Sequence, residues 1–170
     1  MIDWIYSINT DNTARYTLGK NGSRVLLCIG INPSTATPVA LDPTLKRVES
    51  IALNNGYTGW IMLNVYPQRA TDPTDIHLTM DNTLHQENIN AIRELIANYS
   101  SVDVLAAWGT EIGRRPYLMS CLRDIATVLN NNINWLCLDD VTVKGHPRHP
   151  LYKAITSELN QFDIQNYLRN

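Results

Sequence analysis

Residues 25–37 read VLLCIGINPSTAT, an apolar run that passes directly into polar and turn-forming residues. Five consecutive apolar residues are typical of a strand that is buried on both faces, as in a parallel sheet. The run then reaches Gly30, Asn32, Pro33 and Ser34, none of which favours continuing a strand. The strand is therefore predicted to end either in a simple turn or in a group of polar residues that belongs to a site.

Three further apolar runs follow the same pattern, at residues 60–65, 102–107 and 134–138. Segments with a helical spacing of apolar residues separate these runs, and residues 152–162 are predicted to form a last helix. Because predicted strands and helices alternate along the chain, we expect a three-layer α/β/α sandwich with a roughly four-stranded, mostly parallel sheet.

A single domain is expected to span residues 1–170, because this length suits one folded unit with a sizeable core. Residues 1–24 are predicted to form an N-terminal hairpin extension, with Asn21 and Gly22 in its turn. No apolar stretch approaches the length of a membrane span, so no membrane association is expected. The first residues do not read as a secretory signal, and the predicted location is the cytoplasm.

The charge and cysteine content narrow the class of protein. The net charge is −2, from 14 basic and 16 acidic residues. Proteins that coat duplex nucleic acid usually carry an excess of lysine and arginine, so this balance argues against that class while leaving room for a local basic patch. Cys28, Cys121 and Cys137 stand far apart in or beside apolar segments, which predicts buried free thiols. The oligomeric state is not predicted.

Polar residues follow all four predicted strands. The segments are GINPST at 30–35, NVYPQRATDP at 64–73, WGT at 108–110 and KGHPRHPLY at 144–152. In open parallel sheets, ligands bind in a crevice beyond the carboxyl ends of the strands. One such segment would be a turn, whereas four at the same edge predict a pocket.

Several familiar chemistries lack their sequence signatures. Neither a Walker lysine loop nor GxGxxG is present, which disfavours a dinucleotide-binding fold. His146 and His149 are three residues apart, but the prolines beside them prevent the helix that would place both on one face, so no metal site is predicted. A hydrolase built on Ser34 and His149 is a weaker alternative, because the G-x-S-x-G elbow is missing.

Five stretches carry a resemblance to known families, namely GINPSTA, LDPTLKR, LNVYPQRATDP, AAWGTE and GHPRHPLY. With these stretches, which extend over most of its length, the chain resembles an uncharacterised bacterial and phage family, the domain of unknown function 1643 family. In its layout the chain also resembles the uracil-DNA glycosylase superfamily. This second resemblance implies a uracil-DNA glycosylase-like fold.

The glycosylase resemblance also implies roles for individual residues. GINP is similar to the motif whose asparagine positions the attacking water, which assigns that role to Asn32. IMLN is similar to the strand whose last asparagine reads the edge of the base, which implies Asn64. HPRHPLY is similar to a loop whose histidine donates to a pyrimidine oxygen and whose leucine fills the space left by the base. That histidine is either His149 or His146, and the leucine is Leu151. The other residues expected to contact the ligand are Gly30, Ser34, Thr35, Arg69, Trp108, Gly109 and Arg148.

The chain departs from the glycosylase pattern at three points. Ser34 replaces a glycine, no aspartate stands at the slot used by more active members, and the loop near the carboxyl end has two histidines instead of one. Three scattered cysteines do not provide the iron–sulfur cluster of some members, and no cofactor is expected. The predicted function is a nucleobase or nucleotide pocket that hydrolyses N-glycosidic bonds in nucleic acid or a nucleotide. The alternative is a non-catalytic module that binds a nucleotide or a protein partner through the same edge.

Overall fold

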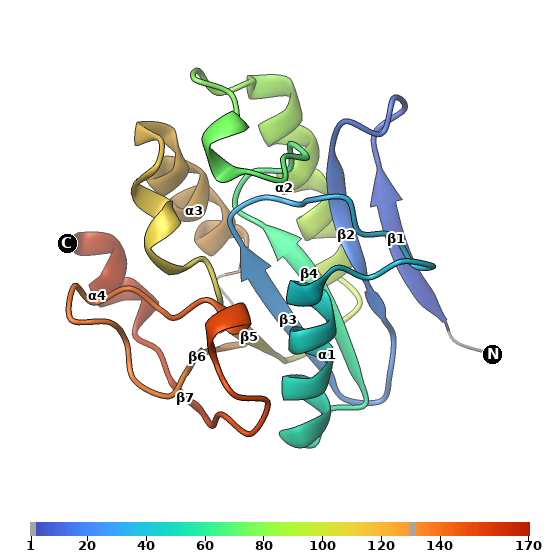
Figure 1. Cartoon of the computed structure of the whole chain (residues 1–170), viewed down its shortest axis with the longest axis vertical. Helices are drawn as coiled ribbons and strands as arrows, with labels where there is room; N and C mark the ends of the chain where they lie inside the picture. The colour runs from blue at the N-terminus through green and yellow to red at the C-terminus, as the bar shows by residue number, and fades with distance from the viewer. Residues whose placement is uncertain (1–2, 130–131) are drawn as a thin grey trace.

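A computed structural model describes residues 3–129 and 132–170, and within them the strands form one seven-stranded sheet (Figure 1). The strand order is β1-β2-β4-β3-β5-β6-β7. The strands are β1 (Trp4–Ile8), β2 (Arg15–Lys20), β3 (Val25–Gly30), β4 (Gly59–Asn64), β5 (Val102–Ala106), β6 (Ile133–Leu138) and β7 (Leu159–Gln161).

The four strands expected from the apolar runs are β3, β4, β5 and β6, and they pair with one another in parallel. The sheet is nevertheless mixed and larger than predicted, because β1, β2 and β7 add antiparallel pairings at its two edges. The α/β class fits the prediction, whereas a four-stranded sheet does not. β1 and β2 fall within the predicted N-terminal hairpin, which was not expected to join the main sheet, and β7 escapes prediction because it has only three residues.

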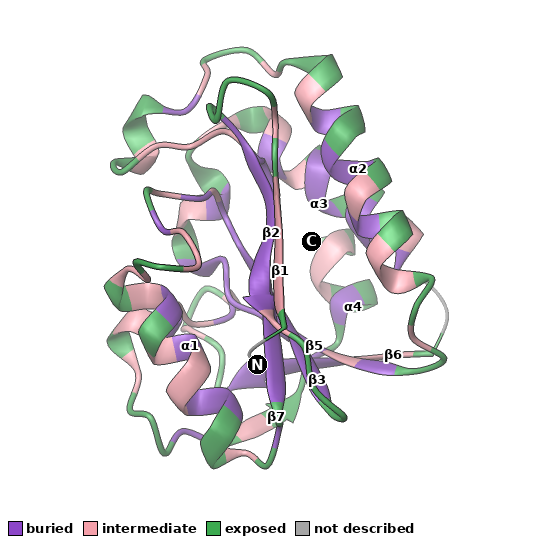
Figure 2. Ribbon diagram, turned by 90° about the vertical axis from the view of Figure 1, so that its right-hand side faces the viewer, coloured by how far each residue is buried: buried purple, intermediate pink, exposed green. Residues whose placement is uncertain are grey.

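Helices cover both faces of the sheet (Figure 2). They are α1 (Pro43–Asn54), α2 (Asn82–Ile96), α3 (Pro116–Val128) and α4 (Ile164–Arg169). One core lies between the sheet and α1, and a larger core lies between the sheet and the other three helices. Alternate residues of β3 supply both cores: Leu26 and Cys28 face α1, whereas Leu27 and Ile29 face the opposite side. This two-sided burial explains why the β3 sequence is continuously apolar.

Two predictions for the chain ends need correction. Residues 4–20 form a hairpin in which β1 pairs antiparallel with β2, but its turn lies between Ile8 and Arg15 and not at Asn21 and Gly22. After β2 the chain does not fold back on that strand, because β4 lies between β2 and β3 in the sheet. Gly22 instead lets the chain pass the backbone of Thr58, from whose carbonyl carbon an added Cβ would be only 2.6 Å away. Residues 152–162 are not a helix either. They contain β7, which pairs antiparallel with residues 136–138 of β6.

The three cysteines are buried and free, as predicted. Burial in apolar surroundings raises the pKa of the Cys121 thiol to about 12, so it is protonated and unreactive at neutral pH. Among the described residues, none of the helices combines the length and apolar character needed to cross a bilayer.

Candidate functional site

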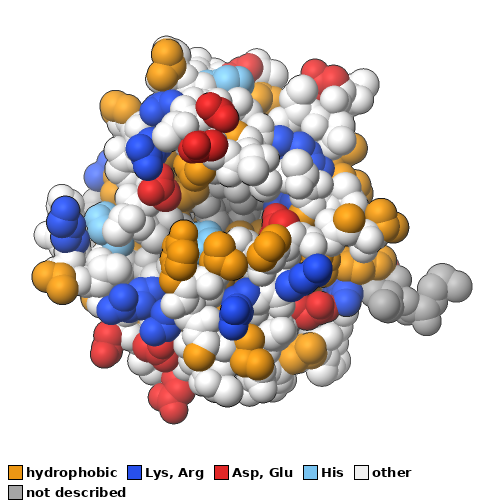
Figure 3. Space-filling model, in the orientation of Figure 1, with side chains coloured by type: hydrophobic (Ala, Val, Ile, Leu, Met, Phe, Trp, Pro, Cys, Tyr) orange, Lys and Arg blue, Asp and Glu red, His pale blue; other side chains and the backbone are white. Residues whose placement is uncertain are grey.

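A cleft of about 590 Å³ opens at the edge of the sheet where the parallel strands end. Figure 3 shows the hollow near the centre of that face. Nine of the twelve residues expected to form a site line this cleft: Gly30, Asn32, Ser34, Asn64, Trp108, Gly109, Arg148, His149 and Leu151. Thr35, Arg69 and His146 do not line it. The convergence follows from the parallel pairing of β3 with β4 and β5, which brings their carboxyl ends together.

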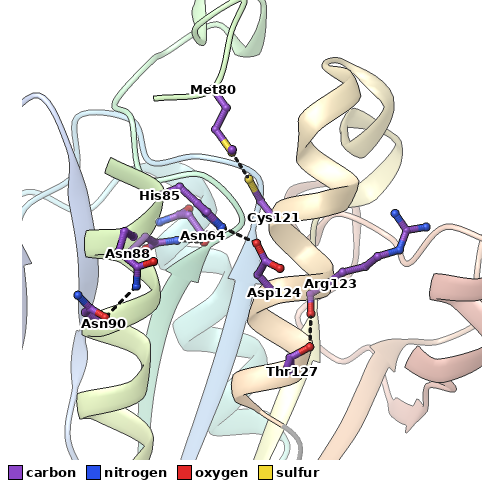
Figure 4. Close-up of polar contacts among 10 residues, drawn as sticks. Asn64, Met80, His85, Asn88, Asn90, Cys121, Arg123, Asp124 and Thr127 are labelled. Atoms are coloured by element: carbon purple, nitrogen blue, oxygen red, sulfur yellow. Dashed lines mark hydrogen bonds and ion pairs between the residues drawn. The ribbon is translucent and has the colours of Figure 1, made fainter. Parts of the chain in front are cut away.

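Asn64 is the most unusual residue of the cleft. It is the last residue of β4 and is fully buried, yet neither its Nδ2 nor its Oδ1 has a hydrogen-bond partner among the described residues. Its main chain is held from α2, because Nδ2 of Asn88 donates to the Asn64 carbonyl oxygen over 2.9 Å (Figure 4). An added Cβ on Gly30 would stand only 2.6 Å from Cε of Met62, and it would be in ordinary contact, at 3.6 Å, with Oδ1 of Asn64.

Asn32 has a fixed amide orientation. Its Nδ2 donates to the carbonyl oxygens of Pro33 at 3.0 Å and Ala70 at 2.9 Å. These two bonds use both amide protons and leave Oδ1 without a donor among the described residues. Asn32 therefore offers the cleft an acceptor oxygen whose direction is set by the surrounding backbone.

His149 offers the cleft a donor. The backbone N–H of Leu151 donates to His149 Nδ1 over 3.2 Å, so in the neutral ring the proton resides on Nε2. Burial lowers the pKa of His149 and outweighs the opposing influence of Asp42 and Glu111, which keeps the ring neutral at neutral pH. Gly109, at a φ of +61°, allows the close approach of this loop, since its Cβ position lies 3.3 Å from the Cβ of His149.

His146 and Trp108 belong to a different cluster, which gathers around Tyr167 of α4. His146 Nδ1 shares a 2.9 Å hydrogen bond with the Tyr167 hydroxyl, and Trp108 Nε1 donates to the same oxygen over 3.1 Å. The Trp108 ring is fully buried and makes edge contacts with Trp135 and Phe162. Trp108 thus forms part of the cleft floor and presents no open face for stacking.

Arg69 lies behind the loop that forms one wall of the cleft. Its guanidinium donates to the carbonyl oxygens of Ser34 and Ala36 and to the hydroxyl of Tyr6. Thr35 is exposed outside the cleft. Both residues were expected to contact a ligand. In the structure Arg69 instead holds the loop in place through hydrogen bonds to its backbone.

Sequence reasoning recovered only part of the charged lining of the cleft. Four basic and two acidic side chains contribute to it, namely Arg15, Arg114, Arg148 and Lys153 with Asp42 and Glu111. Both carboxylates are engaged elsewhere: Asp42 caps α1 by accepting from the N–H of Leu45 at 2.9 Å, and Glu111 pairs with Arg114 at 2.9 Å. The burial of Arg15 was not predicted, because an arginine in a predicted outer hairpin is typical of the solvated surface.

The fold and the cleft define an α/β protein with a cleft at the carboxyl edge of its parallel strands. The family described as "Protein of unknown function (DUF1643)" matches residues 15–151, so the chain belongs to this family. No curated protein and no solved structure matches the chain. The family description names no activity.

Proposed function

We propose that the cleft binds a nucleobase, carried by a nucleotide or by nucleic acid, and that Asn64 reads its edge. The unpartnered amide of Asn64 is the observation that carries this proposal. A buried amide without partners is costly, so its retention favours a ligand that supplies them. The paired edge of a base presents a donor beside an acceptor, which is the complement of an asparagine amide.

His149 supplies a second contact of the right kind. Its Nε2–H donor is neutral, since Leu151 occupies Nδ1 and burial lowers the pKa of the ring. A neutral donor suits the carbonyl oxygen of a base, and the hydrogen bond strengthens as negative charge develops on that oxygen.

The stretches that carry the glycosylase resemblance lie at one edge of the sheet, which supports assigning the chain a glycosylase-like fold.

We further propose that the chain hydrolyses the N-glycosidic bond of the bound nucleotide. In this reaction water adds to C1′ of the sugar, the C–N bond breaks, and its electron pair leaves with the base, which takes up the proton released by the water. Oδ1 of Asn32 is available to accept from that water, and His149 is placed to stabilise the departing base. Both cleft carboxylates are otherwise engaged, so the water is positioned rather than deprotonated by a strong base, and turnover should be slow.

Two measurements test these proposals separately. Binding is tested by the thermal protection that each free nucleoside and nucleotide, in its ribose and deoxyribose forms, gives the wild-type protein. Hydrolysis is tested by screening oligonucleotides that contain uracil, hypoxanthine or mismatches for abasic products. Asn32→Ala should remove most of the turnover while leaving binding largely intact, because positioning a nucleophile acts on the transition state.

The results of the two assays distinguish the alternative functions. Protection without any abasic product would replace the hydrolase with a non-catalytic nucleotide-binding module. An absence of protection by every nucleoside and nucleotide would contradict the nucleobase pocket itself and favour a protein partner at this edge.

A further inference from the structure

Arg15 is a buried cation in the cleft wall that the base-binding proposal does not use. It is only 1% exposed, and it begins β2. Its Nη1 donates to the carbonyl oxygen of Ala36 over 3.2 Å, while its Nε has no partner among the described residues. None of the ion pairs among those residues includes Arg15.

A second arginine makes this isolation more costly. Arg69 donates to the same Ala36 oxygen over 3.3 Å, and it also pairs with no carboxylate among the described residues. Burial and the nearby Arg69 together lower the pKa of Arg15 to about 10, which still leaves it charged at neutral pH. The carboxylate of Asp42 favours the charged form of Arg15 but is held as the cap of α1. A buried charge without a paired counter-charge is unfavourable, so an anion is expected to complete the site.

We propose that the Arg15 side of the cleft is a phosphate subsite, so that the ligand is a phosphorylated nucleoside and not a bare base. Two hydroxyls lie in the same wall, where Ser34 and Thr71 share a 3.4 Å hydrogen bond and both line the cleft. A guanidinium with neighbouring hydroxyls is the usual donor set for phosphate oxygens.

The position of Arg15 in the sheet fits a ligand that carries base and phosphate together. β2 runs antiparallel to β4, and the backbone N–H of Arg15 donates to the carbonyl oxygen of Pro67 over 3.0 Å, in the segment that follows β4. Arg15 therefore lies beside the loop after the strand that carries Asn64, and both residues line the cleft. The lining contains more basic than acidic side chains although the whole chain has a net charge of −2, which also favours an anionic ligand.

This inference rests on the proposed function for the base, and calorimetric titration tests the two apart. The probes are inorganic phosphate, the four common deoxynucleosides with deoxyuridine, and the 5′-monophosphate of each. The wild-type protein should bind at least one monophosphate about tenfold or more tightly than the matching nucleoside, as a charge-assisted contact predicts. Arg15→Gln should remove this preference.

Arg69→Gln is the matched control, because Arg69 holds the same Ala36 oxygen but does not line the cleft. If Arg15 merely braces the loop, both variants should weaken binding of nucleoside and monophosphate equally. If Arg15 holds phosphate, only its variant should lose the preference for the monophosphate. Equal affinity of the wild-type protein for nucleoside and monophosphate would overturn the proposal, whatever the variants do.

If Arg15→Gln does not fold, Arg15→Lys is the variant that tests the phosphate contact. Lysine keeps the charge but loses the planar fork, so monophosphate affinity should still fall several-fold while nucleoside affinity stays constant. An unchanged preference for the monophosphate in Arg15→Lys would contradict a phosphate contact at this residue.

The two proposals fail in different ways. Phosphate-dependent binding that requires Arg15 but does not distinguish the bases would keep the subsite and remove the nucleobase function. Selective binding of nucleosides, with no higher affinity for their monophosphates, would keep the nucleobase function and remove the phosphate subsite. If a 5′-monophosphate binds the protein as tightly as a single-stranded oligonucleotide does, the subsite takes a terminal phosphate. If the monophosphate binds much more weakly than the oligonucleotide, the subsite takes a phosphodiester.

Discussion

Replacing Asn64 by leucine is expected to stabilise the ligand-free protein and to abolish base binding. Asn64 is fully buried, and both polar atoms of its amide lack partners among the described residues. Each unsatisfied buried group costs about 1–3 kcal/mol, so removing two relieves roughly 2–6 kcal/mol. The bulkier leucine must fit beside Gly30 and Met62, which costs about 1–3 kcal/mol. The midpoints of these two ranges give a net gain in the free energy of unfolding of about 2 kcal/mol.

Chemical denaturation of the two proteins without ligand measures this gain. Thermal unfolding should show a midpoint several degrees higher for Asn64→Leu, at roughly 2–4 °C for each kcal/mol. Asn88→Leu is a control, because Asn88 is equally buried and its Oδ1 is also without a partner among the described residues, but its Nδ2 donates to the Asn64 carbonyl oxygen, so its variant should be less stable than Asn64→Leu. A loss of more than about 1 kcal/mol in Asn64→Leu, with nucleoside binding retained, would refute the reasoning.

Three further predictions follow from the neighbouring residues. Because burial lowers the pKa of His149 below its ordinary 6.5, base binding and the contribution of this group to stability should both be complete above that pH. Both should fall as the pH drops through the lowered pKa, since the unfolded chain then binds more protons. A titration of affinity against pH should lose this acid limb in His149→Ala but keep it in His146→Ala. Gly109→Ala should lower stability by about 1–2 kcal/mol and weaken binding, given its φ of +61° and the nearby His149, while Gly113→Ala, whose Cβ meets nothing within 4 Å, serves as control in both assays. Asp42→Ala should cost about 1 kcal/mol in a denaturation experiment through loss of the α1 cap, and no such cost would show that the cap is not a determinant of stability.

The sequence predicted the parts of the fold that depend on two-sided burial. A continuous apolar run such as residues 25–29 has few explanations besides a central strand, and β3 is one. Capping chemistry was equally informative, because Asp42 before Pro43 marks the start of α1 in the structure. The edge strands lack such signals. β7 has only three residues and lies in a segment that was predicted to be helical. Its pairing with β6 is a long-range contact, which the local spacing of apolar residues does not encode.

The cleft was predictable only in part, for the same reason. Residues at or just after the carboxyl ends of parallel strands, such as Asn64 and Asn32, could be placed at one edge from the strand order. The choice between His146 and His149 depended on a hydrogen bond with Tyr167 in the last helix, which no local pattern reveals. Arg15 was missed because its burial depends on β2 lying between two other strands.

The most direct test of a nucleobase pocket is the side-chain amide signal of Asn64 in a ¹H–¹⁵N correlation spectrum. The signal is assigned as the one absent from Asn64→Leu, and nucleosides or nucleotides are then titrated into the wild-type protein. We predict that at least one ligand shifts the two Asn64 amide protons at saturation, with the downfield change of a new hydrogen bond. Binding of a nucleotide, shown by calorimetry on the same sample, with an unmoved Asn64 signal would contradict the assignment of this amide as the reader of the base.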